Sequence, residues 1–172
     1  VKNYSREEFA KKYNLNINKD DILVGILVRL DPVKDVGTFL KAAAEVKKKN
    51  PSIKFIIGGD GDERKALEQQ AKNLGITDTA LFAGWINDSD EFMSCIDINV
   101  LTSLSESFPY TILEGVRLKK ATISSDVGGL SDLIENGENG YLFTPGDYMT
   151  LAGYIMELAE NKSKRAEMGE RI

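Results

Sequence analysis

The chain has 172 residues, of which 42% are apolar and 28% charged, and its formal net charge is −5 at pH 7. That length suits one globular domain with a sizeable core, and the acidic balance argues against nucleic acid as a partner. Histidine is absent, which excludes Ser-His-Asp and Cys-His catalysis and argues against an ordinary zinc site.

Helix and strand signals alternate along the chain. Ser5-Arg6-Glu7-Glu8 is a capping-box pattern that predicts a short helix ending near Tyr13. Apolar, β-branched runs predict strands, and amphipathic or capped segments between them predict helices. We expect strands at 22–28, 53–57, 80–83, 96–101, 121–124 and 141–143, and further helices at 36–49, from the glycine turn to about 74, at 88–95, 109–119, and from 146 or 147 onward, with a polar last part from 161.

Strands that alternate with helices in near-continuous apolar runs predict a parallel sheet covered on both faces. We therefore expect one α/β domain over residues 1–172, a doubly wound Rossmann-like fold with a parallel sheet of about six strands and helices on both faces. Ligands of such sheets bind beyond the carboxyl ends of the strands. The candidate loops are those that follow Val28, Ile57, Ala83, Leu101 and Ser124.

Two cations flank a proline-stiffened turn directly after the first strand. Arg29 and Lys34 stand on either side of Asp31-Pro32. Arginine offers a planar fork to phosphate oxygens, and lysine offers a compact charge. The segment is therefore either a phosphate site or a surface loop with two solvated cations.

The segment after the fourth strand carries two glutamates around a predicted helix start. Proline disfavours helix in the residue before it, so Glu106 is expected in the loop and Glu114 inside the helix, with Ser107 or Phe108 as the cap. The amides of Tyr110 and Thr111 would then form an anion site at the helix start. The alternative is that both glutamates are ordinary surface residues, one of which stabilises the helix dipole.

Three weaker segments follow other strands. Gly58-Gly59-Asp60-Gly61 has Arg64 in place of the third glycine of a dinucleotide fingerprint, so a tight turn is favoured over a phosphate cradle. Gly128-Gly129 allows close backbone approach to a ligand or forms a simple turn. Trp85, in Phe82-Ala83-Gly84-Trp85-Ile86-Asn87, covers either a base or the core, and core capping is the commoner role of a lone tryptophan. Cys95 is expected to be a small buried residue.

Together these segments resemble the C-terminal domain of the group-1 (family 4) retaining glycosyltransferases of the GT-B architecture. The resemblance covers nearly the whole chain, and its most specific part is a Glu-x7-Glu signature formed by Glu106 and Glu114. The other matching segments are Arg29-Leu30 with Lys34, Gly59-Asp60-Gly61, Phe82-Ala83-Gly84-Trp85, Asp126-Val127-Gly128-Gly129, Gly137, Gly140 and Pro145-Gly146-Asp147.

The resemblance implies a nucleotide-sugar donor and assigns roles to particular residues. Arg29 and Lys34 would contact the donor diphosphate and, with Glu106, act in catalysis. Glu106 would bind hydroxyls of the transferred sugar, and Glu114 the ribose. Amides near Phe108, Tyr110 and Thr111 would hold the phosphates, and Trp85 and Ile86 would line the base. No metal and no cofactor are implied beyond a UDP- or GDP-linked sugar, and a hexosyl group would be transferred with retention of configuration.

Several positions depart from the family pattern. Asp35 follows Lys34 where glycine is usual, and Ser107 and Pro109 stand where glycines are common. Lys119-Lys120-Ala121 replaces Gly-x-Pro before the fifth strand, and Asp132 stands where glutamate prevails. None of these changes touches the signature glutamates or the two cations.

Members of this family also carry an N-terminal Rossmann-like domain with the acceptor site, and a terminal helix that returns to it. Nothing in the sequence corresponds to either, so we expect residues 1–172 to be the nucleotide-sugar-binding half of a two-domain enzyme. By itself it should bind nucleotide weakly and transfer no sugar. The missing half would meet the acceptor glycan or lipid.

A cytoplasmic location is expected because the one cysteine can form no intrachain disulfide, and no apolar stretch is long enough to span a membrane. A peripheral position at the inner membrane face, through the missing domain, stays open. The main alternative function is a non-catalytic nucleotide-binding or interaction module. A glycoside hydrolase that uses Glu106 and Glu114 is disfavoured because hydrolases need no diphosphate site.

Overall fold

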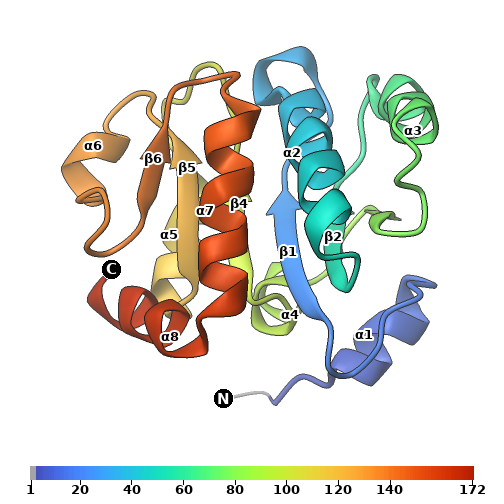
Figure 1. Cartoon of the computed structure of the whole chain (residues 1–172), viewed down its shortest axis with the longest axis horizontal. Helices are drawn as coiled ribbons and strands as arrows, with labels where there is room; N and C mark the ends of the chain where they lie inside the picture. Colours follow the sequence, from blue (N-terminus) through green and yellow to red (C-terminus); the bar gives the residue numbers. More distant parts are fainter. Residues whose placement is uncertain (1–2) are drawn as a thin grey trace.

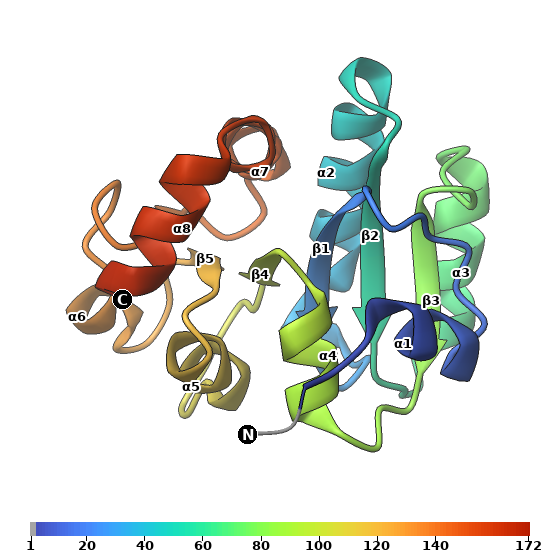
Figure 2. The ribbon, with the colours of Figure 1, turned by 90° about the horizontal axis from the view of Figure 1, so that it is seen from below.

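Residues 3–172 are described by the computed structural model, in which a six-stranded sheet is covered by helices on both faces (Figures 1 and 2). The helices are α1 (Arg6–Lys12), α2 (Val36–Lys49), α3 (Arg64–Asn73), α4 (Ser89–Cys95), α5 (Tyr110–Arg117), α6 (Leu130–Leu133), α7 (Tyr148–Glu160) and α8 (Lys162–Arg171), with one 3-10 turn, η1 (Pro32–Lys34). The strands are β1 (Ile22–Leu27), β2 (Ile53–Gly58), β3 (Ala80–Gly84), β4 (Ile98–Leu101), β5 (Ala121–Ser125) and β6 (Tyr141–Phe143). The predicted doubly wound α/β fold is confirmed.

The centre of the sheet is formed by β1 and β4, which pair in parallel with Val24 opposite Ile98. Both strands are buried on both faces and apolar except for Asn99 in β4, and a strand of that kind needs helices above and below it. Gly25 lies where α4 packs directly on β1. A Cβ atom there would lie 2.7 Å from Cγ2 of Ile96 and 3.0 Å from the ring of Phe92, so a larger residue would push α4 off the sheet.

The helices form two layers. In Figure 1, α2 and α7 lie side by side on one face of the sheet, and Figure 2 shows α4 and α5 on the opposite face. An edge-to-face aromatic pair joins helix and strand on the first face, where the Phe39 and Phe55 rings are 5.5 Å apart. On the second face the Phe9 and Phe92 rings, 6.0 Å apart, join α1 to α4. Each layer therefore has its own apolar core.

The strand order β3-β2-β1-β4-β5-β6 places a topological switch point between β1 and β4. The chain moves outward from β1 through β2 to β3, then returns to the centre and continues outward through β4, β5 and β6. In open α/β sheets the crevice at the switch point is the usual ligand site, because the loops on its two sides diverge. The loops that follow β1 and β4 are those that carry Arg29, Lys34 and Glu106.

The closing helix differs from the prediction, because it is broken at Asn161. This residue has φ −127° and ψ 90°, and its side chain accepts a hydrogen bond from the amide of Lys164 at 3.0 Å. Asn161 therefore ends α7 and caps α8, a role for which asparagine is well suited. The polar change noted from position 161 marks this break. The short α6 and η1 are also additions to the predicted elements.

All described helices are short. The longest, α2, has 14 residues, whereas a helix that crosses a bilayer needs about 20 apolar residues. Within residues 3–172 no helix combines the length and the apolarity that a membrane crossing requires.

Candidate functional site

The loops after β1 and β4 enclose a hollow of about 490 Å³ at the carboxyl edge of the sheet. Six of the predicted site residues line it together: Arg29, Lys34, Glu106, Phe108, Tyr110 and Thr111. They come from segments more than 70 positions apart in the sequence and meet because β1 and β4 are neighbours. The structure thus brings the two most informative sequence segments into one site.

The two cations differ in how free they are. The side chain of Arg29 is 73% exposed, and its Nε lies 3.8 Å from Asp31 Oδ2, so it is held only loosely. Lys34 ends η1, whose first residue is the proline predicted to stiffen the turn. Its side chain is largely covered and turns toward the β4 loop. Arg29 is therefore the more exposed and less engaged cation of the site, and Lys34 is the one held by a close ion pair.

Lys34 and Glu106 form an ion pair. Lys34 Nζ lies 3.1 Å from Glu106 Oε2 and 3.4 Å from Oε1, and the Glu106 side chain is only 9% exposed. Burying a carboxylate costs free energy, which a cation and further hydrogen bonds offset. Ser103 supplies one of these, because its Oγ donates to Glu106 Oε2 at 2.9 Å. The sequence predicted both residues as site members, but not that they pair.

The start of α5 differs from the expected cap. Pro109 is the N-cap, in place of Ser107 or Phe108, and no side chain caps the helix. The amide of Tyr110 donates to the carbonyl of Phe108 at 3.0 Å. Among the described residues no acceptor is recorded for the amide of Thr111, so the anion site predicted from two amides reduces to this one.

A second hollow, of about 380 Å³, adjoins the first and shares Leu27, Val28 and Arg29 with it. Trp85 and Ile86 form its outer wall. Trp85 is 73% exposed, so of its two alternative roles core capping does not hold. Ile86 is the neighbour that enters the core. The tryptophan is left with a flat face at the hollow's edge.

The glycine turn after β2 supports the Arg29 loop. Gly59 has φ +116°, and a Cβ atom there would lie 1.8 Å from the carbonyl oxygen of Val28. At Gly61 the corresponding distance to the Leu30 carbonyl oxygen is 2.4 Å. The glycines thus allow close approach of two loops of the protein itself, as the tight-turn interpretation predicts.

Asp60, in the same turn, lines the second hollow. Its Oδ1 accepts from the amide of Gly61 at 2.8 Å, and this bond, with the guanidinium of Arg64, holds the pKa of the carboxyl below its usual value. Arg64, in the third-glycine position, therefore fixes an ionised Asp60 in the wall.

Gly128 also serves the site by packing against the protein. It has φ +56°, and a Cβ atom there would lie 2.4 Å from the carbonyl oxygen of Glu106. The close approach that the paired glycines allow is thus to the Glu106 loop, and it fixes that loop from the β5 side.

Glu114 lies apart from the two hollows. Its Oε2 accepts from Ser89 Oγ at 3.1 Å, and Arg117 lies 4.0 Å away. It is half-buried between α5 and the first residue of α4. Of the predicted donor-binding residues, it is the one that lines neither hollow.

Sequence reasoning missed three buried hydroxyls beneath the site: Thr102, Ser103 and Ser125. Thr102 Oγ1 donates to the carbonyls of Lys34 and Asp35, and Ser125 Oγ donates to the carbonyl of Ser103. Their signal in the sequence is position, because Thr102 and Ser103 are the first two residues after β4 and Ser125 ends β5. Among residues 3–172 no group of three His, Cys, Asp or Glu side chains could hold a metal ion.

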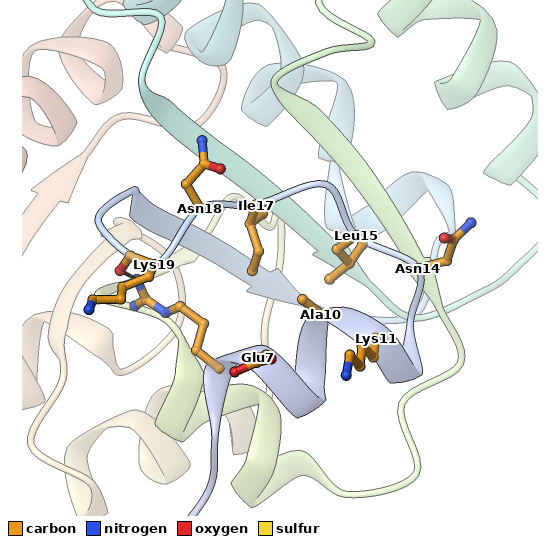
Figure 3. A pocket seen from close by; sticks show the side chains of 9 residues that line it. Glu7, Ala10, Lys11, Asn14, Leu15, Ile17, Asn18 and Lys19 are labelled. Atoms are coloured by element: carbon orange, nitrogen blue, oxygen red, sulfur yellow. Dashed lines mark hydrogen bonds between the residues drawn. The ribbon is translucent and has the colours of Figure 1, made fainter.

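A larger hollow, of about 600 Å³, lies at the opposite edge of the sheet, between α1 and the segment that follows it (Figure 3). Figure 3 shows Ala10, Leu15 and Ile17 in its interior and Lys11 and Lys19 at its rim. Because it lies at the amino end of β1, it has no part in the switch-point crevice. Its lining contains none of the predicted site residues.

Comparison with known proteins gives a family match over almost the whole chain. The family model described as glycosyl transferases group 1 matches residues 6–172. The N-acetyl-alpha-D-glucosaminyl L-malate synthase of Bacillus anthracis is 31% identical over 167 residues, which are 95% of this chain and 42% of that protein. The chain therefore spans less than half the length of this relative.

Solved structures agree with the fold and with the partial coverage. An Anabaena protein crystallised with UDP and glucose is 29% identical, with a TM-score of 0.86 over 96% of this chain and 46% of the other. The C-terminal domain of a group 1 family glycosyl transferase from Francisella tularensis is 27% identical, with a TM-score of 0.82 over 97% of this chain and 90% of the other.

Proposed function

The chain belongs to the group 1 glycosyltransferases, and from this premise we propose that it is the donor-binding domain of an enzyme that transfers a sugar from a nucleotide diphosphate to an acceptor hydroxyl. The observation that carries the proposal is the meeting of Arg29, Lys34, Glu106 and the Thr111 amide around one hollow at the switch point. Cations and a free helix amide suit a diphosphate, and a carboxylate suits the hydroxyls of a sugar.

Each group has a role in the proposed site. Arg29, exposed and loosely held, reaches the diphosphate first, and Lys34 and the start of α5 neutralise the charge that develops as the bond from sugar to phosphate breaks. Glu106 accepts hydrogen bonds from hydroxyls of the transferred sugar. Phe108 and Tyr110, whose rings lie 4.6 Å apart, shield this edge of the hollow from water.

The second hollow is proposed as the nucleoside site. The exposed face of Trp85 offers a stacking surface for a base, beside Ile86. Glu114 reaches the ribose by turning away from Ser89, whose hydroxyl it accepts in this structure. UDP is the nucleotide crystallised with the Anabaena relative, so a uridine donor is favoured over a guanosine donor.

The finer properties of the reaction are also proposals. Transfer of a hexosyl group with retention of configuration, without a metal, follows the family pattern and fits a site whose positive charge comes from side chains and a helix start. The acceptor glycan or lipid and the second domain would come from outside residues 1–172, so this chain alone should bind nucleotide without transferring sugar. A cytoplasmic setting, with or without contact to a membrane surface, fits this role.

Calorimetric titration of the chain with UDP, GDP and ADP tests the proposal. We expect saturable binding of UDP, and we expect Glu114→Ala to weaken it about tenfold, because a ribose loses a charged acceptor. Arg171→Ala, a change at an exposed cation of α8, is the control and should leave binding unchanged. No saturable binding of any nucleotide would favour an interaction module instead.

A further inference from the structure

Two consecutive hydroxyl residues, Thr102 and Ser103, lie beneath the ion pair of the site and are fully buried. Thr102 Oγ1 donates to the carbonyl oxygens of Lys34 at 2.8 Å and Asp35 at 3.0 Å. Ser103 Oγ donates to Glu106 Oε2 at 2.9 Å. One hydroxyl therefore holds the turn that carries the lysine, and the next holds the carboxylate that pairs with this lysine.

The turn at Lys34 needs such support. Asp35, which follows it, has φ +47°, a left-handed conformation that costs free energy in a residue other than glycine. The two carbonyls on either side of this bend share the hydroxyl of Thr102. The amide of Leu104 adds a bond to the carbonyl of Val33 at 2.8 Å. The lysine backbone is thus fixed to the end of β4 rather than to its own strand alone.

The Glu106 loop is held separately, through Ser103. The carbonyl of Ser103 accepts from Ser125 Oγ at 2.7 Å, which ties this residue to the end of β5. Glu106 Oε2 accepts from both Lys34 and Ser103. When Lys34 turns to a bound diphosphate, the serine is the contact that keeps the carboxylate in place.

We propose that Thr102 and Ser103 are positioning residues with separate tasks: Thr102 sets Lys34 for the donor diphosphate, and Ser103 sets Glu106 for the hydroxyls of the transferred sugar. The inference rests on the proposed function and deepens it. Two adjacent residues of similar chemistry should therefore affect two different parts of one ligand.

The test is calorimetric titration of wild type, Thr102→Val and Ser103→Ala with UDP and with UDP-glucose, UDP-galactose and UDP-N-acetylglucosamine. Ser103→Ala should weaken the best-bound UDP-sugar about tenfold and change UDP binding less than about twofold, because the serine acts only through the sugar-binding carboxylate. Thr102→Val should weaken UDP and the UDP-sugar equally, by about tenfold, because both carry the diphosphate.

Matched controls separate positioning from general loss of packing. Thr79→Val removes a buried hydroxyl that donates to a backbone carbonyl at the amino edge of β3, and Ser124→Ala removes a buried hydroxyl that donates only to the carbonyl of Ser125. Both should leave binding unchanged. Thr102→Ser and Ser103→Thr keep a hydroxyl and should restore most of the affinity. Thermal unfolding of each variant shows that the titrated protein is folded.

The outcomes distinguish the inference from its premise. Two results would overturn the division of tasks: an equal loss of affinity for UDP and the UDP-sugar in Ser103→Ala, or a loss in Thr102→Val for the UDP-sugar only. In either case, UDP binding by wild type would still support the donor site. If wild type binds neither UDP nor any UDP-sugar, the donor site itself is wrong and the inference falls with it. Wild-type binding that neither Thr102→Val nor Ser103→Ala weakens would also overturn it.

Discussion

The two edges of the sheet both carry a hollow with an arginine and a lysine beside it, but the arginines are in opposite situations. At the amino edge, Arg6 donates to the carbonyls of Cys95 and Asp21 at 2.8 Å each and to Asp97 at 3.1 Å. At the carboxyl edge, Arg29 has one loose contact, with Asp31. The larger hollow thus lies beside a cation already used to hold the protein together.

The difference teaches that the availability of a cation, more than the size of the hollow, marks the site. Arg6 joins α1 to the beginning of β4, and its guanidinium has few donors left for a ligand. Arg29 has nearly all of its donors free and stands at the switch point. A ligand site requires a cation that is free to bind, as Arg29 is at the carboxyl edge. A structural contact requires a cation whose donors are already used, as those of Arg6 are at the amino edge.

The largest expected effect separates two glycines with positive φ, one at each edge. Gly59→Ala should lower the free energy of unfolding by about 4 kcal/mol, because its Cβ would overlap the Val28 carbonyl in addition to the backbone strain. Gly75 has φ +70°, but no atom lies within 4 Å of the Cβ that alanine would add. Gly75→Ala should cost about 1 kcal/mol, from strain alone.

Urea unfolding of the two glycine variants measures this difference. The fraction of Gly59→Ala that remains folded should also bind nucleotide more weakly than wild type, because the turn supports the Arg29 loop. Equal destabilisation of the two variants would show that the close approach of the glycine turn to Val28 does not hold in solution.

The arginines themselves give the second prediction. Arg6→Ala should lower the free energy of unfolding by about 2 kcal/mol, because several partly buried acceptors lose their donor. UDP binding by the folded protein should not change. Arg29→Ala should do the opposite: stability stays within about 0.5 kcal/mol of wild type, and UDP binding weakens about tenfold.

Denaturant unfolding and calorimetry on the same preparations give the free energy of unfolding and the UDP affinity of each variant. The proposed difference between the two arginines is wrong if fully folded Arg6→Ala binds UDP more weakly than wild type, or if Arg29→Ala unfolds the chain. Raised salt should weaken UDP binding by wild type more than by Arg29→Ala, since the variant has lost an exposed charge contact.

Sequence patterns were sufficient for the strands, and they singled out residues that the structure brings to one hollow, whose roles in binding stay predictions. Apolar runs predict all six strands, and parallel strands bring their carboxyl ends to one edge, so the sequence places Arg29 and Glu106 at the same edge of the sheet. The Lys34–Glu106 pair was out of reach, because it depends on β1 and β4 being neighbours, which the order of strands along the chain does not reveal. The roles of Thr102 and Ser103 depend on the same neighbourhood.

Two of the three described residues other than glycine with a left-handed backbone lie at departures from the family pattern. Asp35 and Lys119 stand where the family resemblance indicates glycine, and their φ angles are +47° and +57°. Lys119 follows Leu118, the C-cap of α5, and the amides of Lys119 and Lys120 bond back to the carbonyls of Val116 and Gly115. Glycine is preferred at such a position because it has no Cβ to strain.

The smallest expected effect therefore has opposite signs at the two edges. Lys119→Gly, at the amino edge of β5, should stabilise the protein by about 0.5 kcal/mol, since relief of strain exceeds the entropy lost to a more flexible unfolded chain. Its side chain gives up only an exposed pair with Glu170. Asp35→Gly, at the carboxyl edge, should destabilise by about 0.5 kcal/mol, because Asp35 Oδ2 accepts from Thr38 Oγ1 at 2.7 Å.

Urea titrations of both variants beside wild type, at one temperature and protein concentration, resolve the sign. UDP binding should stay unchanged in Lys119→Gly, which lies far from the site. If Asp35→Gly also stabilised the protein, the hydrogen bond from Thr38 would contribute less than the strain of the bend, and the aspartate would be tolerated there rather than favoured. Opposite signs would show that Asp35 offsets the strain of its turn through the hydrogen bond from Thr38, whereas Lys119 only strains its turn.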